Sequence, residues 1–362
     1  MIIYLLGAFI MSLVCGLVFT PLILDFCKRK KLYDIPNERK VHKNAIPRLG
    51  GISFFPSMMV AFAAMLFFFT QSHRYSIPMN TWSASFLFGV TIIYFTGIID
   101  DLIGLNAVTK FIVQILTACL FPMAGLYINH LYGLFGIDEI PNYIGIPLTV
   151  FVIVFIDNAI NLIDGIDGLA SGLSLIALTG FLLYFSHYHV FVYTYSIIAA
   201  GMMGALIAFM YFNLFGRPER NTKIFMGDSG SLSLGFTMGF FAVKCAMNNE
   251  QIWPERTEAI LVPVTLLFVP IADVARVIIF RIRHGLRLFT ADKNHIHHKL
   301  MRMGMTQHQA LCTILLLAVS YIAMNGLMFW WGLSFTVILA ADVLLFCLVI
   351  MGINHRTKVA AA

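Results

Sequence analysis

Long apolar stretches alternate with short polar segments along the whole chain. A helix that crosses a bilayer needs about 20 apolar residues, and eleven stretches come near or above that length. The pattern predicts an all-α integral membrane protein, a multi-span bundle of about eleven transmembrane helices in a single domain over residues 1–362. The predicted spans are 2–26, 51–70, 83–99, 109–128, 146–162, 169–186, 191–214, 231–247, 259–281, 309–328 and 331–352.

The polar segments between these spans differ in basic residues. Alternate segments, which would share one face of the membrane, hold 20 of the 24 Lys and Arg residues. Cytoplasmic loops carry such an excess, so this face is predicted to be cytoplasmic, with the N-terminus outside and the C-terminus inside. The basic segments are 27–50, 100–110, 215–230, 281–308 and 353–362.

Composition supports a membrane protein and argues against a nucleic-acid-binding one. Hydrophobic residues make up 59% of the chain and charged residues 12%. The net charge of +6 would suit a nucleic acid, but the one-sided placement of the basic residues accounts for it better. The first apolar stretch has no basic segment before it and no small-residue cleavage site, so it is predicted to be a retained span.

Acidic residues concentrate at the predicted cytoplasmic ends of the spans. Ionisable groups near a bilayer are costly, and their presence there usually marks a functional site. These aspartates share their face with a histidine-rich loop over residues 295–298, which indicates an enzyme acting on a charged substrate, with a metal involved. The aspartates concerned are Asp100, Asp101, Asp157, Asp164, Asp167 and Asp228.

Asp100 and Asp101 are adjacent at the end of a predicted span. Neighbouring carboxylates raise one another's pKa unless a cation holds both ionised. Lys110 begins the next span and is placed to return to the same rim and pair with a phosphate. The alternative is a solvated helix end beside a lysine that extends to the membrane surface.

A second acidic segment contains Asn158, Asn161, Asp164 and Asp167. The first three are spaced three residues apart, so on a helix they share a face, and glycines then let the chain turn with Asp167 close by. Such hard oxygen ligands suit Mg²⁺. Interhelical polar packing is the alternative, and Asp157 is assigned a structural role.

A third segment, residues 223–231, joins a basic loop to an apolar stretch. Glycines and a helix N-terminus favour a bound phosphate, which Asp228 would repel unless a metal lies between them. A metal–diphosphate site resolves this conflict. Asp228 as a helix N-cap is the alternative.

The histidines at positions 295, 297 and 298 have basic neighbours and suit phosphate binding. A zinc site, or a basic loop that binds anionic lipid, is the alternative. In the preceding span, Asp273 and Arg276 are three residues apart and predict an ion pair within the helix.

Five segments, in this order, resemble those of the polyprenyl-phosphate N-acetylhexosamine-1-phosphate transferases of the WecA and TagO type, which are related to the MraY translocases. They are PRLGG at 47–51, DD at 100–101, NAINLIDGIDG at 158–168, FMGDSGS at 225–231 and HIHH at 295–298. The translocases typically show three successive histidines where this chain has HIHH, so the resemblance favours the first group.

The resemblance implies transfer of an N-acetylhexosamine 1-phosphate, expected to be GlcNAc-1-phosphate, from a UDP-sugar to undecaprenyl phosphate. It implies a bacterial inner membrane location, membrane lipid around the enzyme, a homodimer, and Mg²⁺ with Mn²⁺ as a substitute. Asp228 and Asn161 would hold the metal, and Asp100 or Asp101 would orient or deprotonate the acceptor.

The resemblance also implies roles for the remaining candidates. Lys110 would bind the lipid phosphate, Phe225 would stack on uracil, and His297 and His298 would contact the donor phosphates. Asn158 and His295 are expected to bind substrate, and Asp164 and Asp167 to belong to the catalytic group.

Three other functions are alternatives to this transferase. A phospho-MurNAc-pentapeptide translocase would use the same motifs on a larger donor. A transporter would place polar residues at mid-membrane, often in repeated halves, whereas here they lie at the rim and no repeat is evident. A CDP-alcohol phosphatidyltransferase would need a DGxxAR signature, of which the chain has only a fragment at residues 167–170.

Overall fold

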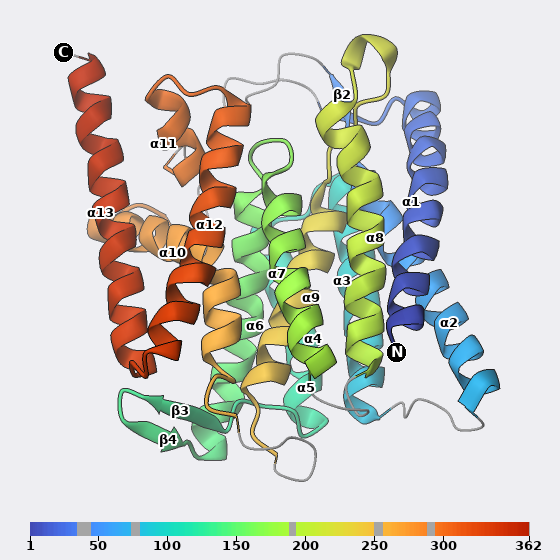
Figure 1. The fold of residues 1–362 in the computed structure, drawn as a ribbon. Helices are drawn as coiled ribbons and strands as arrows, with labels where there is room; N and C mark the ends of the chain where they lie inside the picture. The colour runs from blue at the N-terminus through green and yellow to red at the C-terminus, as the bar shows by residue number, and fades with distance from the viewer. Residues whose placement is uncertain (35–44, 74–79, 188–192, 250–255, 288–293, 362) are drawn as a thin grey trace.

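The computed structural model is a bundle of long helices that run between two polar ends (Figure 1). It describes residues 1–34, 45–73, 80–187, 193–249, 256–287 and 294–361. Within these ranges the elements other than long helices are two short antiparallel strand pairs and a few short helices. The all-α multi-span fold predicted from the sequence is therefore confirmed.

Nine helices are long and apolar enough to cross a membrane, within the part of the chain that the structure describes. Eight of them coincide with predicted spans without interruption, and α2 continues from a short 3₁₀ helix over Gly50–Ser53. They are α1 (Ile2–Lys30), α2 (Phe54–His73), α3 (Thr81–Ile103), α6 (Asn142–Ile163), α7 (Leu169–His187), α8 (Tyr193–Phe215), α10 (Leu261–Arg283), α12 (Gln307–Trp330) and α13 (Phe335–Ala361).

The other two predicted spans differ from a long apolar helix. The stretch expected at 109–128 forms α4 (Ala107–Ala118) and the short α5 (Leu120–Met123). The stretch expected at 231–247 forms α9 (Asp228–Ala246), which is buried along almost its whole length. Because α9 contacts other helices rather than lipid, it tolerates the Ser and Gly residues that lower its hydropathy.

Helix α9 lies at the centre of the bundle because glycines let its neighbours approach closely, as small residues do in membrane helices. A Cβ on Gly97 of α3 would lie 2.5 Å from the Cα of Ser229. A Cβ on Gly235 of α9 would lie 2.6 Å from the Cα of Asp157 on α6. Helices α3 and α9 are therefore fixed against one another at the start of α9, and α6 and α9 are fixed deeper in the bundle.

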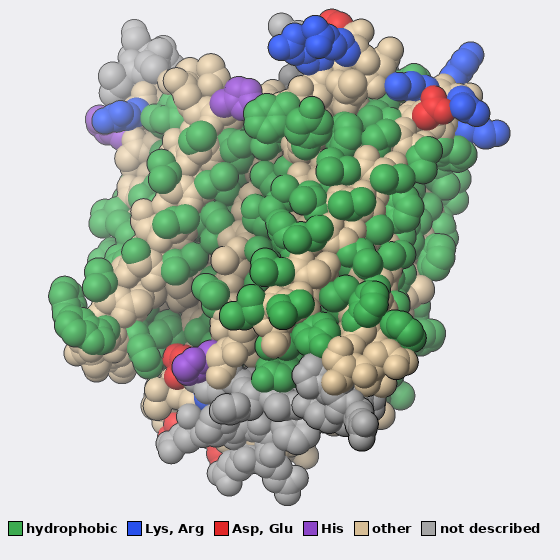
Figure 2. Space-filling model, turned by 45° about the vertical axis from the view of Figure 1, so that its right-hand side comes forward, with side chains coloured by type: hydrophobic (Ala, Val, Ile, Leu, Met, Phe, Trp, Pro, Cys, Tyr) green, Lys and Arg blue, Asp and Glu red, His purple; other side chains and the backbone are tan. Residues whose placement is uncertain are grey.

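The two ends of the bundle differ in charge. The C-terminus, α11 (Ile296–Arg302) and the strands β1 (Tyr33–Asp34) and β2 (Ile46–Pro47) lie at one end, which we call the polar end (Figure 1). Basic side chains gather there, above a wide apolar band (Figure 2). The hairpin of β3 (His130–Leu134) and β4 (Ile137–Glu139) lies at the opposite end.

Two loops pair at the polar end although they are far apart in sequence. The amide of Phe225 donates to the carbonyl of Pro47 (2.7 Å), and the amides of Gly50 and Gly51 donate to the carbonyls of Phe225 and Met226 (2.9 and 2.8 Å). A Cβ on Gly51 would lie 2.1 Å from the Cα of Gly230, so only glycine fits there. This pairing holds the loop before α9 across the ends of α1 and α8.

Candidate active site

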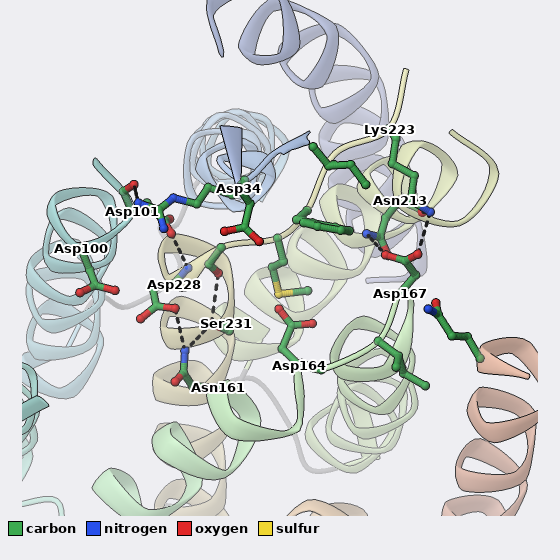
Figure 3. A pocket seen from close by; sticks show the side chains of 18 of the residues that line it. Asp34, Asp100, Asp101, Asn161, Asp164, Asp167, Asn213, Lys223, Asp228 and Ser231 are labelled. Carbon is green, nitrogen blue, oxygen red and sulfur yellow. Dashed lines mark hydrogen bonds and ion pairs between the residues drawn. The ribbon is translucent and has the colours of Figure 1, made fainter. Parts of the chain in front are cut away.

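A cavity of about 480 Å³ opens at the polar end, between the ends of α3, α6 and α8 and the start of α9 (Figure 3). Its walls combine carboxylates, amides and cations with a few apolar side chains. Eight of the twelve site residues predicted from the sequence line it: Asp100, Asp101, Asn161, Asp164, Asp167, Phe225, Asp228 and His298. Further lining residues include Asp34, Arg48, Asn213, Lys223, Met226, Ser231 and Gln307.

Asp101 holds the N-terminus of α9 in place. Its Oδ1 accepts from the amide of Asp228 (2.9 Å) and its Oδ2 from the amide of Ser229 (3.0 Å). The guanidinium of Arg48 donates to the Asp101 carbonyl oxygen. Free N–H groups at a helix start need such acceptors, so Asp101 acts as an N-cap supplied from another helix. Asp228, for which a capping role was the alternative, instead directs its side chain to the cavity.

Lys110 joins Asp100 to Asp228. Its ammonium Nζ lies 2.7 Å from Asp228 Oδ2 and 3.2 Å from Asp100 Oδ2. The other Asp100 oxygen accepts from the amide of Leu105 (2.6 Å), which fixes the turn between α3 and α4. The adjacent aspartates therefore differ: Asp101 caps α9, whereas Asp100 shares a cation with Asp228.

Asn161 completes this side of the cavity. Its Nδ2 donates to Asp228 Oδ1 (3.2 Å) and to the Ser231 hydroxyl (2.8 Å). Asp228 thus has one oxygen facing Lys110. Its other oxygen faces the amide of Asn161 (Figure 3).

A second polar group lies across the cavity, around Asp167. The ammonium of Lys223 lies 2.7 Å from Asp167 Oδ2, and the Asn213 amide donates to Asp167 Oδ1 (3.3 Å). Asn213 is buried, accepts from the amide of Gly168 (2.8 Å) and donates to the carbonyl of Ile224 (2.9 Å). It therefore ties the start of α7 to the loop that carries Phe225.

Asp164 lies between these two groups and points into the cavity (Figure 3). Among the described residues, no hydrogen bond or ion pair reaches its carboxylate. Burial, with the nearby charges of Asp228 and Asp167, raises the pKa of the Asp164 carboxyl to about 7. A carboxylate in this situation is poised to bind a cation.

The three predicted histidines occupy different environments. His295 is buried, and its Nδ1 lies 2.8 Å from Asp273 Oδ2. Asp273 also pairs with Arg276 at 2.7 Å, so the predicted intrahelical ion pair is confirmed. His297 is buried behind the cavity wall, where a Cβ on Gly165 would lie 2.2 Å from its Nε2. Burial lowers the pKa of His297 to about 3, so its ring is neutral at pH 7. His298 lines the cavity.

Asn158 does not line the cavity. Its Nδ2 donates to Gln114 Oε1 (2.9 Å) and to the carbonyl of Val154 (2.8 Å). The Gln114 amide in turn donates to Asp157 Oδ2 (2.9 Å). Asn158 and Asp157 therefore join α6 to α4 inside the bundle, which agrees with the structural role expected for Asp157.

The cavity residues fit a small divalent cation. Mg²⁺ binds through one or two carboxylates and completes its shell with substrate phosphate and water. The carboxylates of Asp228 and Asp164 are such a pair, and a turn of the Asn161 amide, whose nitrogen faces Asp228, would add its oxygen. No three His, Cys, Asp or Glu side chains form a metal-binding group by themselves among the described residues. The donor set accordingly fits a cation held together with its substrate.

Several residues in and around the site carry no local sequence pattern that would identify them. Asn213 and Gln114 are single amides within apolar stretches, where no local pattern distinguishes them from packing residues. Lys223 and Arg48 belong to segments that were recognised, but their partners Asp167 and Asp101 lie far away in sequence. The signal available was their position beside glycine-rich turns.

The chain is similar to known proteins over most of its length. Residues 83–246 match the model of glycosyl transferase family 4. A probable undecaprenyl-phosphate N-acetylglucosaminyl 1-phosphate transferase of Bacillus subtilis (strain 168) is 31% identical over 92% of this chain and 88% of that protein. An undecaprenyl-phosphate alpha-N-acetylglucosaminyl 1-phosphate transferase of Yersinia pestis is 32% identical over 82% of the chain and 76% of that protein. A decaprenyl-phosphate N-acetylglucosaminephosphotransferase of Mycobacterium leprae is 32% identical over 85% and 79%.

Proposed function

The chain belongs to glycosyl transferase family 4, and from this premise we propose that it transfers GlcNAc-1-phosphate from UDP-GlcNAc to undecaprenyl phosphate. An oxygen of the lipid phosphate would attack the β-phosphorus of the donor. The bond between that phosphorus and the bridging oxygen would break, and UMP would leave. The products are UMP and a lipid-linked GlcNAc diphosphate.

The observation that carries this proposal is the arrangement of Asp228 between Lys110 and Asn161, with Asp164 facing them. Donor and acceptor are both anionic, so their approach needs positive charge in a fixed geometry. Asp228, Asp164 and Asn161 would hold Mg²⁺, for which Mn²⁺ would substitute. The bound metal would neutralise the donor diphosphate and polarise it.

Lys110 is best placed to bind the acceptor phosphate. It belongs to α4, whose side chains Val108, Phe111 and Ile112 are exposed toward the surroundings of the bundle. A polyprenyl chain would lie along these apolar side chains, and its phosphate would reach the Lys110 ammonium. Asp100, which contacts the same ammonium, would orient the acceptor and take a proton from it when it arrives as a monoanion.

The opposite wall suits the nucleoside. Phe225 offers an aromatic face, and the polar group of Asn213, Lys223 and Asp167, which lines the same cavity, offers hydrogen-bonding partners. Stacking of uracil on Phe225 would place the donor diphosphate toward Asp228, across the cavity. Direct attack by the lipid phosphate is the simpler route; a covalent aspartyl intermediate is the alternative.

The charge distribution supports the proposed membrane orientation. Basic side chains gather at the polar end, which holds the cavity (Figure 2). Cytoplasmic segments carry this excess, so the active site would face the cytoplasm of a bacterial cell, where UDP-sugars are made.

The test is release of UMP from UDP-GlcNAc by the purified full-length protein in detergent. We expect release only when undecaprenyl phosphate and Mg²⁺ are both present, together with a lipid product containing GlcNAc and diphosphate. Preference for another UDP-N-acetylhexosamine would overturn the choice of sugar. Absence of release with every UDP-N-acetylhexosamine, including UDP-MurNAc-pentapeptide, from folded protein would overturn the proposed reaction.

A further inference from the structure

Helix α4 carries Lys110 but has little packing around it. Of residues 107–114, which form its first two turns, Gln114 alone is buried. Val108, Phe111 and Ile112 are exposed on the outer side of the helix. A segment with so few buried side chains is held weakly by apolar contacts, so the position of Lys110 depends on the polar contacts at the two ends of this segment.

At the start of the segment, two side chains fix the turn into α4. Asp100 Oδ1 accepts from the amide of Leu105 (2.6 Å), and Asn106 Oδ1 accepts from the amide of Thr109 (2.7 Å). Its other end is fixed by Gln114, whose amide nitrogen donates to Asp157 Oδ2 (2.9 Å) and whose carbonyl oxygen accepts from Asn158 (2.9 Å). Both polar atoms of Gln114 are thus used, and both partners belong to α6.

The same contact also involves α9. Asp157 is buried, and a Cβ on Gly235 of α9 would lie 2.7 Å from Asp157 Oδ1. Helices α4, α6 and α9, which supply Lys110, Asn161 and Asp228, therefore also meet deeper in the bundle. The residues in contact there are Gln114 of α4, Asp157 of α6 and Gly235 of α9.

The spacing along each helix relates these deeper contacts to the residues at the cavity. Gln114 follows Lys110 by four residues, and Asp157 precedes Asn161 by four, so each pair lies on one helix face about 6 Å apart. Gly235 follows Asp228 by seven residues, or two turns of α9. The deeper contacts among Gln114, Asp157 and Gly235 therefore fix the relative positions of Lys110, Asn161 and Asp228.

We propose that Gln114 is a positioning residue, which holds Lys110 at the distance from Asp228 and Asp100 that binding of the acceptor phosphate requires. This inference rests on the proposed transfer reaction and adds a residue to it. Gln114 is buried, and both polar atoms of its side chain are bound to α6, so it would act through Lys110 rather than on the substrate. A shift of about 1 Å in such a group can cost about 100-fold in rate, because the reacting groups are no longer aligned.

The experiment compares three variants of the full-length protein. Gln114→Met keeps the length of the side chain and removes both hydrogen bonds. Gln114→Glu places a carboxyl against Asp157, and the double variant Gln114→Glu with Asp157→Asn restores one carboxylate and one amide between α4 and α6. The matched control is Asn325→Leu, which removes a buried amide that joins α12 to Asp342 of α13 (2.8 Å) and to Thr265 of α10 (2.9 Å).

We expect Gln114→Met to lower kcat by about 10- to 100-fold and to raise the KM for the lipid phosphate, with the KM for the donor nearly unchanged. Gln114→Glu should lose activity, and the double variant should recover most of it. Asn325→Leu should lower the thermal unfolding midpoint without changing kcat for the folded enzyme.

A second readout needs no turnover. The rate at which acetic anhydride acylates Lys110, followed by mass spectrometry, reports how tightly the ammonium is held by Asp100 and Asp228. We expect faster acylation in Gln114→Met and the wild-type rate in Asn325→Leu. An unchanged acylation rate with kcat within about twofold of the wild type, or equal losses of kcat in Gln114→Met and Asn325→Leu, would overturn the inference. If the wild-type protein transfers no sugar phosphate, the proposed function fails, and the acylation rates alone decide the role of Gln114.

Discussion

The Lys110 ammonium lies 2.7 Å from the Asp228 carboxylate, although 118 residues separate the two positions. The pair joins the short helix α4 to the start of the central helix α9. In the proposed reaction Lys110 binds the acceptor phosphate and Asp228 holds the metal at the donor, so the two substrates would meet at this contact.

Replacing Lys110 by Met should lower kcat by at least about 100-fold, because a lost charge-assisted contact in a buried site costs several kcal/mol of transition-state stabilisation. The measurement is the steady-state rate of UMP release at saturating lipid phosphate and donor. The control is Lys30→Met at the exposed end of α1, which should retain full activity. Equal rates in the two variants would show that Lys110 has no part in the reaction.

Substitution of Asp101 should lower stability, whereas substitution of Asp228 should abolish turnover. Asp101→Ala removes the acceptor of two amides at the start of α9 and should cost about 1–2 kcal/mol of stability, as lost caps do. Asp228→Ala should keep the unfolding midpoint, since its side chain is partly exposed at the rim, but should lose Mg²⁺-dependent turnover. Thermal unfolding in detergent and a Mg²⁺ titration of UMP release separate the two effects. Normal turnover in Asp228→Ala would refute its assignment as a metal ligand.

The affinity for Mg²⁺ should increase as the pH rises from 6 to 8. The pKa of the Asp164 carboxyl is raised to about 7, so below that pH the metal must displace a proton, whereas above it the carboxylate is already ionised. The measurement is the Mg²⁺ concentration that gives half-maximal activity at each pH. In Asp164→Asn the dependence on pH should flatten; an equally steep dependence would assign the titration to another group.

Phe225→Ala should raise the KM for UDP-GlcNAc by about tenfold, which corresponds to the loss of one stacking contact. The KM for undecaprenyl phosphate should stay near the wild-type value, because Lys110, the residue proposed to bind the acceptor phosphate, is held by Asp100 and Asp228. Phe225→Tyr, which keeps the ring, is the matched control. If the donor KM is the same in all three proteins, the uracil binds elsewhere.

The stability of the protein should fall as the pH drops from 6.5 toward 3, in part because of His297. Its folded-state pKa is lowered to about 3 by burial, whereas the unfolded chain binds a proton near pH 6.5. Protons therefore favour the unfolded state throughout this window, and the contribution of the neutral ring is lost as the pH falls. The titratable neighbours of this ring are His298, His295 and Asp273. The check is the unfolding midpoint at several pH values, which should vary less in His297→Gln.

Much of the fold could be predicted from the sequence, because a bilayer imposes a simple length and hydropathy rule on each span. Among the described residues the rule located every long helix, and two of the predicted spans differ from a long apolar helix. The stretch at 109–128 breaks between α4 and α5, and α9 is too rich in small polar residues to resemble a lipid-facing span. Contacts with other helices determine the break between α4 and α5 and the composition of α9, and hydropathy carries no information about such contacts.

Most of the site residues could also be predicted from local sequence, because aspartates, asparagines and glycines gather at the ends of the spans. Eight of the predicted residues line one cavity. Only the tertiary structure gives Asp100 and Asp101 different partners, Lys110 for the first and the amides of α9 for the second. It also directs Asn158 to Gln114 and places Asn213 between Gly168 and Ile224. Helical periodicity determines which residues share a face of one helix. It does not determine which face of another helix they meet, because that depends on close packing at positions such as Gly97 and Gly235, which lie far apart in the chain.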